Sequence, residues 1–108
     1  MLNYKIYLEQ IKKMIGRLED STKNISLKKF SKDDVLFDAT VLRLQVIGES
    51  IKSVSLEVKK KNKQVKWKLF SKLRNFLSHK YIQVDKEIIY NLVKKEIPQL
   101  KEQINTVK

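Results

Sequence analysis

Apolar side chains recur at three- and four-residue spacing along most of this chain, which is the pattern of amphipathic helices. Residues 2–20 show this pattern first, and residues from Ser31 to about Val58 show it again. The second stretch is apolar over most of its circumference, which predicts a central helix that packs on several sides. No stretch alternates between apolar and polar residues as a half-buried strand would. Helices are therefore the expected secondary structure.

Connections separate these helices. Residues 21–30 break the helical period and predict a connection. After them, Ser31 with Asp34 three residues later predicts the start of a helix. The lysine-rich residues 59–66 predict a basic loop, and a third helix is expected to begin near Trp67.

Two residues mark the last predicted helices. Asp85 is expected to cap a fourth helix, and Pro98 is expected in the first turn of a short final helix. The sequence therefore predicts an all-α fold, an up-and-down bundle of four main helices plus a short C-terminal helix. A length of 108 residues suits one domain that covers residues 1–108.

The charge of the chain favours a polyanionic partner. Its net charge is +12, and of its 24 basic residues only Arg17, Arg43 and Arg74 are arginine. A surplus of this size attracts nucleic acid, although lysines also commonly form nothing more than a solvated surface. Cysteine is absent, which excludes disulfides and thiolate metal sites. Without a long apolar run or a signal-peptide pattern, we expect a soluble cytoplasmic protein that does not bind membranes.

Residues 74–81, R-N-F-L-S-H-K-Y, contain the only histidine of the chain. On a helix Asn75 and His79 share one face, whereas Arg74 lies about 140° from His79 and shares the adjacent face with Ser78. An imidazole can accept the proton of a ribose 2′-hydroxyl, and a guanidinium can stabilise charge that develops on a phosphate. These residues therefore suit RNA cleavage without a metal. Alternatively, His79 only binds carbonyl groups at the end of its helix.

Cleavage by this route needs one acid and one base, but the chain has one imidazole. Two copies related by a two-fold axis would supply a pair of His79 side chains across one interface. The catalytic interpretation therefore predicts a homodimer with the site at its seam. It predicts no metal, since one histidine and no cysteine make a poor set of ligands.

The motif and its surroundings resemble HEPN-domain proteins of the HepT type, whose signature is R-x4-H-x-Y. The resemblance covers most of the chain, because further matching elements occur in the same order: I-G-E-S at 47–50, Trp67, Y-I-Q-V-D at 81–85 and I-P-Q-L at 97–100. It implies a HEPN-like helical fold and a dimeric, metal-independent ribonuclease toxin that needs no cofactor.

The same resemblance implies roles for individual residues. Arg74 and His79 would be catalytic, and Asn75 would support the site. A minimal nucleotidyltransferase would act as the antitoxin by transferring AMP to Tyr81, which adds bulk and negative charge beside the catalytic pair. The chain departs from the family pattern at Lys72-Leu73, where a small pair often precedes the arginine. It departs again at Lys80, where an acidic residue is common; a lysine there could help to hold phosphate.

Several further residues are weaker candidates. Glu49 either pairs with Arg74 or lies on a polar face, and Ser78 is a second supporting candidate. Gly48, in the middle of the central helix, indicates either close helix packing or close backbone approach near a site. Six lysines in and beside the basic loop either guide RNA by phosphate attraction or are solvated: Lys59, Lys60, Lys61, Lys63, Lys66 and Lys68.

Two other functions fit the same sequence. The chain could be a non-catalytic HEPN module that binds nucleotide or nucleic acid beside a nucleotidyltransferase, with Arg74 and His79 gripping a phosphate. It could also be a purely structural dimeric bundle. The structural interpretation leaves the clustering of a rare arginine and the sole histidine unexplained.

Overall fold

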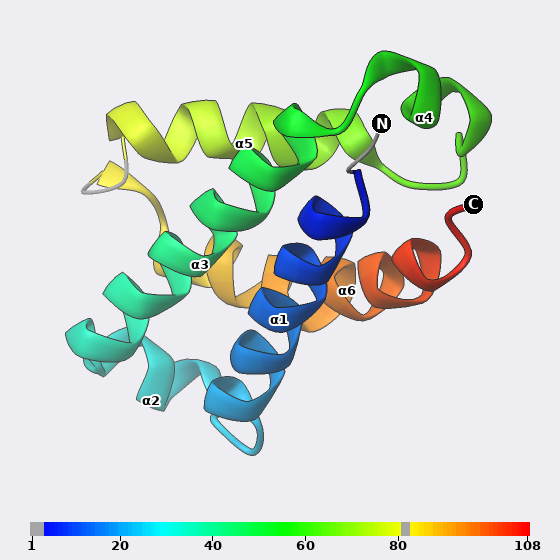
Figure 1. Cartoon of the computed structure of the whole chain (residues 1–108). Coiled ribbons are helices and arrows are strands. Elements are labelled where there is room, and N and C mark those ends of the chain that lie inside the picture. Colours follow the sequence, from blue (N-terminus) through cyan, green and yellow to red (C-terminus); the bar gives the residue numbers. More distant parts are fainter. Residues whose placement is uncertain (1–3, 81–82) are drawn as a thin grey trace.

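Six helices form the protein in the computed structural model, which describes residues 4–80 and 83–108 (Figure 1). Four of them are long, and two are short helices of six residues each that connect the long ones. In order they are α1 (Tyr4–Thr22), α2 (Leu27–Lys32), α3 (Asp34–Ser53), α4 (Leu56–Lys61), α5 (Trp67–Lys80) and α6 (Lys86–Asn105). The described residues contain no strand, and the predicted all-α fold is confirmed.

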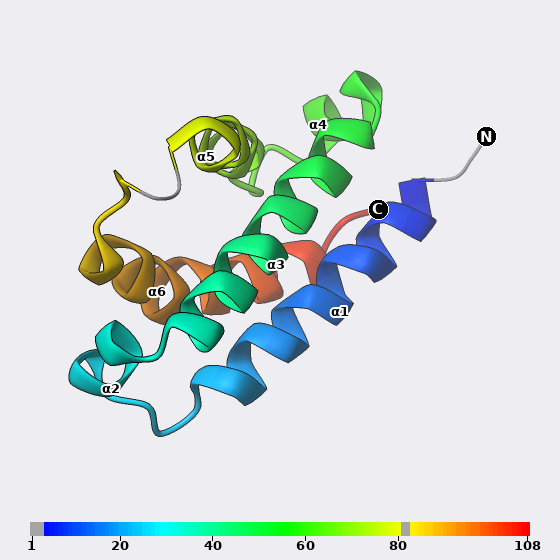
Figure 2. The same cartoon turned by 90° about the vertical axis from the view of Figure 1, so that its left-hand side faces the viewer.

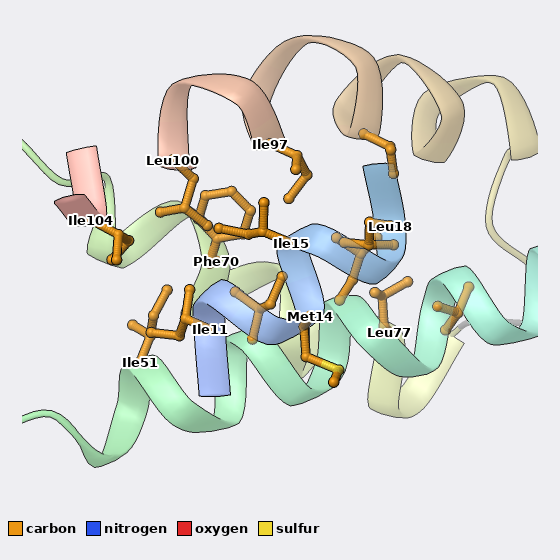
Figure 3. Close-up of a cluster of buried hydrophobic side chains, with 14 of the residues drawn as sticks. Ile11, Met14, Ile15, Leu18, Ile51, Phe70, Leu77, Ile97, Leu100 and Ile104 are labelled. Atoms are coloured by element: carbon orange, nitrogen blue, oxygen red, sulfur yellow. The ribbon is translucent and has the colours of Figure 1, made fainter. Parts of the chain in front are cut away.

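Helix α3 is central, as its broad apolar surface predicts. It lies between α1 and α5, and α6 passes behind it in the view of Figure 2. Figure 3 shows apolar side chains from α1, α3, α5 and α6 meeting in one cluster. The fully buried members include Ile11, Leu44, Ile51, Phe70 and Ile97. Burial of each such side chain contributes about 1.5–3 kcal/mol, so this contact among four helices is the main source of stability.

Side-chain caps set where four of the helices begin. Ser26, Asp33, Ser55 and Asp85 each accept a hydrogen bond from a backbone N–H in the first turn of the helix that follows. The cap predicted at Asp85 is therefore confirmed. The start predicted at Ser31 is wrong, because Asp33 caps α3 through a 2.9 Å bond from the Leu36 N–H.

Pro98 does not begin a new helix. It lies inside α6, which runs without interruption from Lys86 to Asn105, so the predicted division into a fourth helix and a short final helix is wrong. Proline removes one backbone donor and crowds the preceding turn. Here Pro98 is exposed, whereas buried Ile97 and Leu100 continue the apolar stripe that Ile89 and Val93 begin. Burial of that stripe outweighs the local cost of the proline.

Two short helices occupy regions predicted as connections. Helix α2 lies partly within residues 21–30, because Ser26 caps it and fully buried Phe30 anchors it. Helix α4 takes the first part of the predicted basic loop, and α3 ends at Ser53 rather than near Val58. In each case a serine N-cap starts a turn that the spacing of apolar residues alone does not indicate.

In the part of the chain that the structure describes, every helix is too short or too polar to cross a membrane.

Candidate active site

The motif residues from Arg74 to Lys80 lie on α5, the helix that packs against one side of α3. Leu77 and Phe70 are buried and fix the orientation of α5, while Asn75, Ser78, His79 and Lys80 are exposed. The helix remains regular through Lys80. The angular positions expected from helical geometry therefore apply, with Asn75 and His79 on one face.

Helices α3 and α5 approach each other closely at Gly48. A Cβ placed on it would lie 2.3 Å from the Arg74 Cβ and 2.7 Å from the Phe70 carbonyl oxygen. Gly48 therefore permits close packing of α3 against α5, and the part of the α5 backbone that approaches it carries Arg74. The glycine brings the base of the Arg74 side chain directly onto α3.

We expect the Gly48→Ala variant to lose about 2 kcal/mol of unfolding free energy, because the new methyl group meets the Arg74 Cβ and the Phe70 carbonyl oxygen, which can move away only if the helices separate. Gly16 in α1 is a matched control, since a Cβ there meets nothing within 4 Å. Gly16→Ala should gain up to about 1 kcal/mol from helix propensity. Urea unfolding of both variants measures the difference, and equal stabilities would contradict the close-approach argument.

Arg74 is held by two neighbours. Its Nη2 lies 2.6 Å from the Glu49 Oε2, and its Nη1 donates a 3.0 Å hydrogen bond to the Asn75 Oδ1. These contacts use two of the five N–H groups of a guanidinium. The Glu49 side chain is 56% exposed, so it both pairs with Arg74 and lies on the outer surface of α3. The guanidinium is thus oriented at the surface, where a phosphate can reach it.

Ser78 is directed at its own helix. Its hydroxyl donates a 2.9 Å hydrogen bond to the Arg74 carbonyl oxygen, which is common for serine one turn along a helix. This bond fastens the turn that joins Arg74 to the end of α5. Ser78 therefore contacts the backbone of Arg74 and not its guanidinium.

His79 is exposed in the last turn of α5. It lies about 7.5 Å along the helix axis from Arg74 and about 140° around it. The two side chains of one chain therefore point to different sides of the helix. The Arg74 guanidinium nevertheless reaches toward the face of His79, because its Nη1 donates to the Asn75 Oδ1.

The family model for HepT-like ribonucleases matches residues 11–107. The chain belongs to the HepT-like ribonuclease family. The resemblance of the chain to this family is thereby confirmed, and the match includes α3, α5 and α6.

Relatives within the curated proteins carry names of the same kind. A Methanocaldococcus jannaschii protein named "Gamma-glutamylcyclotransferase and putative RNase" is 39% identical over 100 residues, which are 93% of this chain and 45% of that protein. A "Putative RNase" of Caldanaerobacter subterraneus is 38% identical over 94% of this chain and 90% of its own length. The "Probable ribonuclease HepT" of Thermococcus cleftensis is 31% identical over 92% of this chain and 90% of its own length. No solved structure matches this chain significantly.

The chain thus spans less than half of the first relative and most of the other two. Tyr81, which the sequence resemblance predicts to be modified with AMP, lies outside the described residues. Its role therefore stays a prediction. Lys80, beside it, is exposed at the end of α5.

The lysines of the predicted basic loop lie at the opposite end of α5 from His79. The end of the helix at Trp67 is about 18 Å from His79 along the axis. Lys66 contacts two side chains of α6: its Nζ lies 3.0 Å from the Glu96 Oε1 and donates a 3.2 Å hydrogen bond to the Gln99 Oε1. The Lys61 Nζ lies 3.8 Å from the Glu57 Oε2. The structure therefore does not bring these side chains together with the motif.

The other loop lysines differ in their surroundings. Lys59 and Lys60 lie in the last turn of α4. Partial burial of Lys59 lowers the pKa of its ammonium group. Lys63 is exposed in the linker after α4. Lys68, by contrast, lies in the first turns of α5 and shares the helix of His79. Among the six predicted lysines, it is the one that helical geometry connects to the motif.

Buried Asn62 ties the linker after α4 to the start of α5 and to the end of the chain. Its carbonyl oxygen accepts a 2.9 Å bond from the Trp67 indole N–H. Its side chain exchanges bonds with the backbone of Lys108, at 3.1 Å and 3.3 Å. This role of Asn62 could not be predicted from the sequence, where it is a single polar residue five positions before Trp67.

Proposed function

We propose that this protein is a metal-independent endoribonuclease toxin that cleaves RNA at a site on a dimer interface. One observation supports the proposal above all. In a chain of the HepT-like ribonuclease family, Arg74 is held at the surface by Glu49 and Asn75, on the same helix as exposed His79.

The proposed reaction is a transesterification. His79 accepts the proton of a ribose 2′-hydroxyl, whose oxygen attacks the adjacent phosphorus. The bond from phosphorus to the 5′-oxygen breaks, and the partner subunit's His79, in its protonated form, donates a proton to that oxygen. Arg74 stabilises the negative charge on the non-bridging oxygens. The products are a 2′,3′-cyclic phosphate and a 5′-hydroxyl, so atoms and protons balance.

The dimer is part of this proposal because two imidazoles are needed. The outer face of α3 offers apolar side chains for the contact: Val35 is 81% exposed and Leu42 is 60% exposed. Seven residues separate them, so they share a face, and Glu49 continues the same line at the next seven-residue step. Pairing of this face with its two-fold copy would bury apolar area beside Glu49 and Arg74.

We expect the protein to sediment as a dimer at micromolar concentration and Leu42→Glu to sediment as a monomer. Two like charges facing each other across a two-fold axis oppose association. Ile6→Glu is the matched control, because Ile6 is similarly exposed, at 57%, but lies on α1. A monomeric wild-type protein, or a dimer that tolerates Leu42→Glu, would argue against this interface.

The experiment that tests the function is cleavage of a mixed RNA pool in excess EDTA. Intact-mass analysis first establishes that Tyr81 carries no AMP. We expect products with 2′,3′-cyclic phosphate ends, and protein with His79→Ala, purified in the same way, controls for a contaminating nuclease. Absence of cleavage, or equal cleavage by the variant, would favour a non-catalytic module that binds nucleotides or nucleic acid.

Regulation completes the proposal. A minimal nucleotidyltransferase antitoxin would transfer AMP from ATP to Tyr81, two residues after His79. The added phosphate is negatively charged and would repel an RNA backbone while pairing with Arg74. This part of the proposal rests on membership of the HepT-like family and on the presence of a tyrosine at the position of the motif.

A further inference from the structure

The exposed face of α5 carries a line of polar and basic side chains that leads to His79. Lys68, Lys72, Asn75 and His79 are spaced by four, three and four residues, so they follow one another along one face of the helix. All four are exposed. The sequence of α5, W-K-L-F-S-K-L-R-N-F-L-S-H-K, contains no acidic residue to oppose them. This line is a positive surface that ends at the candidate catalytic histidine.

An exposed aromatic ring lies beside this line. Phe76 is 48% exposed, whereas Trp67 and Phe70, the other aromatic residues of α5, are buried. It follows Lys72 by four residues and precedes His79 by three, so it is a surface neighbour of both. Aromatic rings among cationic side chains are the usual composition of surfaces that bind single-stranded nucleic acid, since bases stack on the rings and phosphates meet the cations.

We propose that this face of α5 is a track for single-stranded RNA, in which Lys68 and Lys72 bind backbone phosphates and Phe76 stacks on a base next to the cleaved bond. The proposal rests on the proposed function and names its substrate class. Lys72 lies about 10 Å and Lys68 about 16 Å from His79 along the axis. The strand therefore extends toward the Trp67 end of α5 on one side of the cut.

The geometry also indicates which RNA the track accepts. A base can stack on Phe76 only when it is unpaired and turned away from its neighbours, as in loops and single strands. In Figure 2, α5 is seen nearly end-on at the edge of the molecule, with its outer side away from α3. A strand can therefore lie along it without entering the core of the bundle.

Binding to a labelled single-stranded RNA, measured as a function of salt in a His79→Ala background, tests the lysines without cleavage. Each phosphate contact contributes about 0.7 to the slope of log affinity against log salt on a single strand. The Lys68→Gln, Lys72→Gln double variant should therefore lower the slope by about 1.4. Lys13→Gln, an exposed lysine on α1, should leave it unchanged. An unchanged slope in the double variant would overturn the track.

Phe76 is tested by shape-matched substitutions in the same background. Phe76→Leu keeps apolar bulk but removes the ring, and it should bind RNA about tenfold more weakly. Phe76→Trp should retain affinity. If Phe76→Leu binds as well as the parent, the ring does not stack. If it sediments as a monomer, Phe76 instead contacts a second copy of the chain, and the stacking role is wrong.

The outcomes separate this inference from the proposed function. Wild-type protein that fails to cleave any RNA would refute the ribonuclease, but the salt slope and the Phe76 variants would still decide the track. Wild-type protein that cleaves, together with a double variant whose binding is unchanged, would refute the track alone. Equal affinity for single-stranded and fully paired RNA would also contradict it, because a paired base cannot reach Phe76.

Discussion

The His79→Ala variant is expected to cleave RNA about 10²–10⁴-fold more slowly than the wild-type protein at neutral pH. The reason is the loss of both proton transfers, since each copy of the chain has one imidazole. RNA affinity should change much less than the rate, because Arg74 remains in place to bind phosphate. Single-turnover cleavage and equilibrium binding, measured on the same RNA, separate these two effects. Lower affinity with an unchanged rate would mean that His79 only binds.

Mixed dimers test whether two histidines act together. When wild-type and His79→Ala chains exchange freely, a fraction f of wild-type chains gives a fraction f² of dimers with two imidazoles. Activity should therefore fall with the square of f if one histidine is the base and the other is the acid. A linear fall would show that each copy cleaves independently, and it would remove the mechanistic reason for the dimer.

The Arg74→Lys variant is expected to lose about as much activity as Arg74→Ala, about 10²–10³-fold in the rate constant. Lysine keeps the charge, but it lacks the planar fork that contacts Glu49 and Asn75 at the same time. Its ammonium would be held by Glu49 alone or would turn to water. Cleavage kinetics at saturating RNA measure the loss.

Arg43→Lys is the matched control for this substitution. Arg43 lies on α3 and its Nη1 donates to the Arg17 carbonyl oxygen at 3.3 Å and to the Ser21 Oγ at 3.0 Å, so it faces α1. Its replacement should leave the cleavage rate unchanged. Full activity in Arg74→Lys would show that charge alone is sufficient at this position and that the orientation by Glu49 and Asn75 is irrelevant to catalysis.

The two catalytic candidates lie on one helix but point in different directions. Helix α5 stays regular through Lys80, so the offset of about 140° between Arg74 and His79 is a property of the fold. Within our proposal, this offset favours a site shared between two copies, in which the RNA strand crosses α5 from the side of Arg74 to the side of His79. The same offset makes Asn75, which contacts Arg74 and shares the face of His79, a candidate for bridging the two sides.

Much of the fold and part of the site could be predicted from the sequence. The spacing of apolar residues indicates the long helices because a buried stripe must recur every three to four residues. The arrangement of Asn75 and His79 follows from the same geometry. The roles of Ser26 and Ser55 could not be predicted in this way, because a cap depends on one side chain and leaves no period in the sequence.

The sequence by itself determined an all-α protein and a helix that carries the motif, since both depend on local spacing along the chain. Only the tertiary structure decided that Pro98 lies within a continuous α6, because burial of the stripe around Ile97 outweighs the local cost of proline. It also decided the partner of Glu49. That contact requires α3 and α5 to cross at Gly48, and residues 25 positions apart meet only when the core has packed.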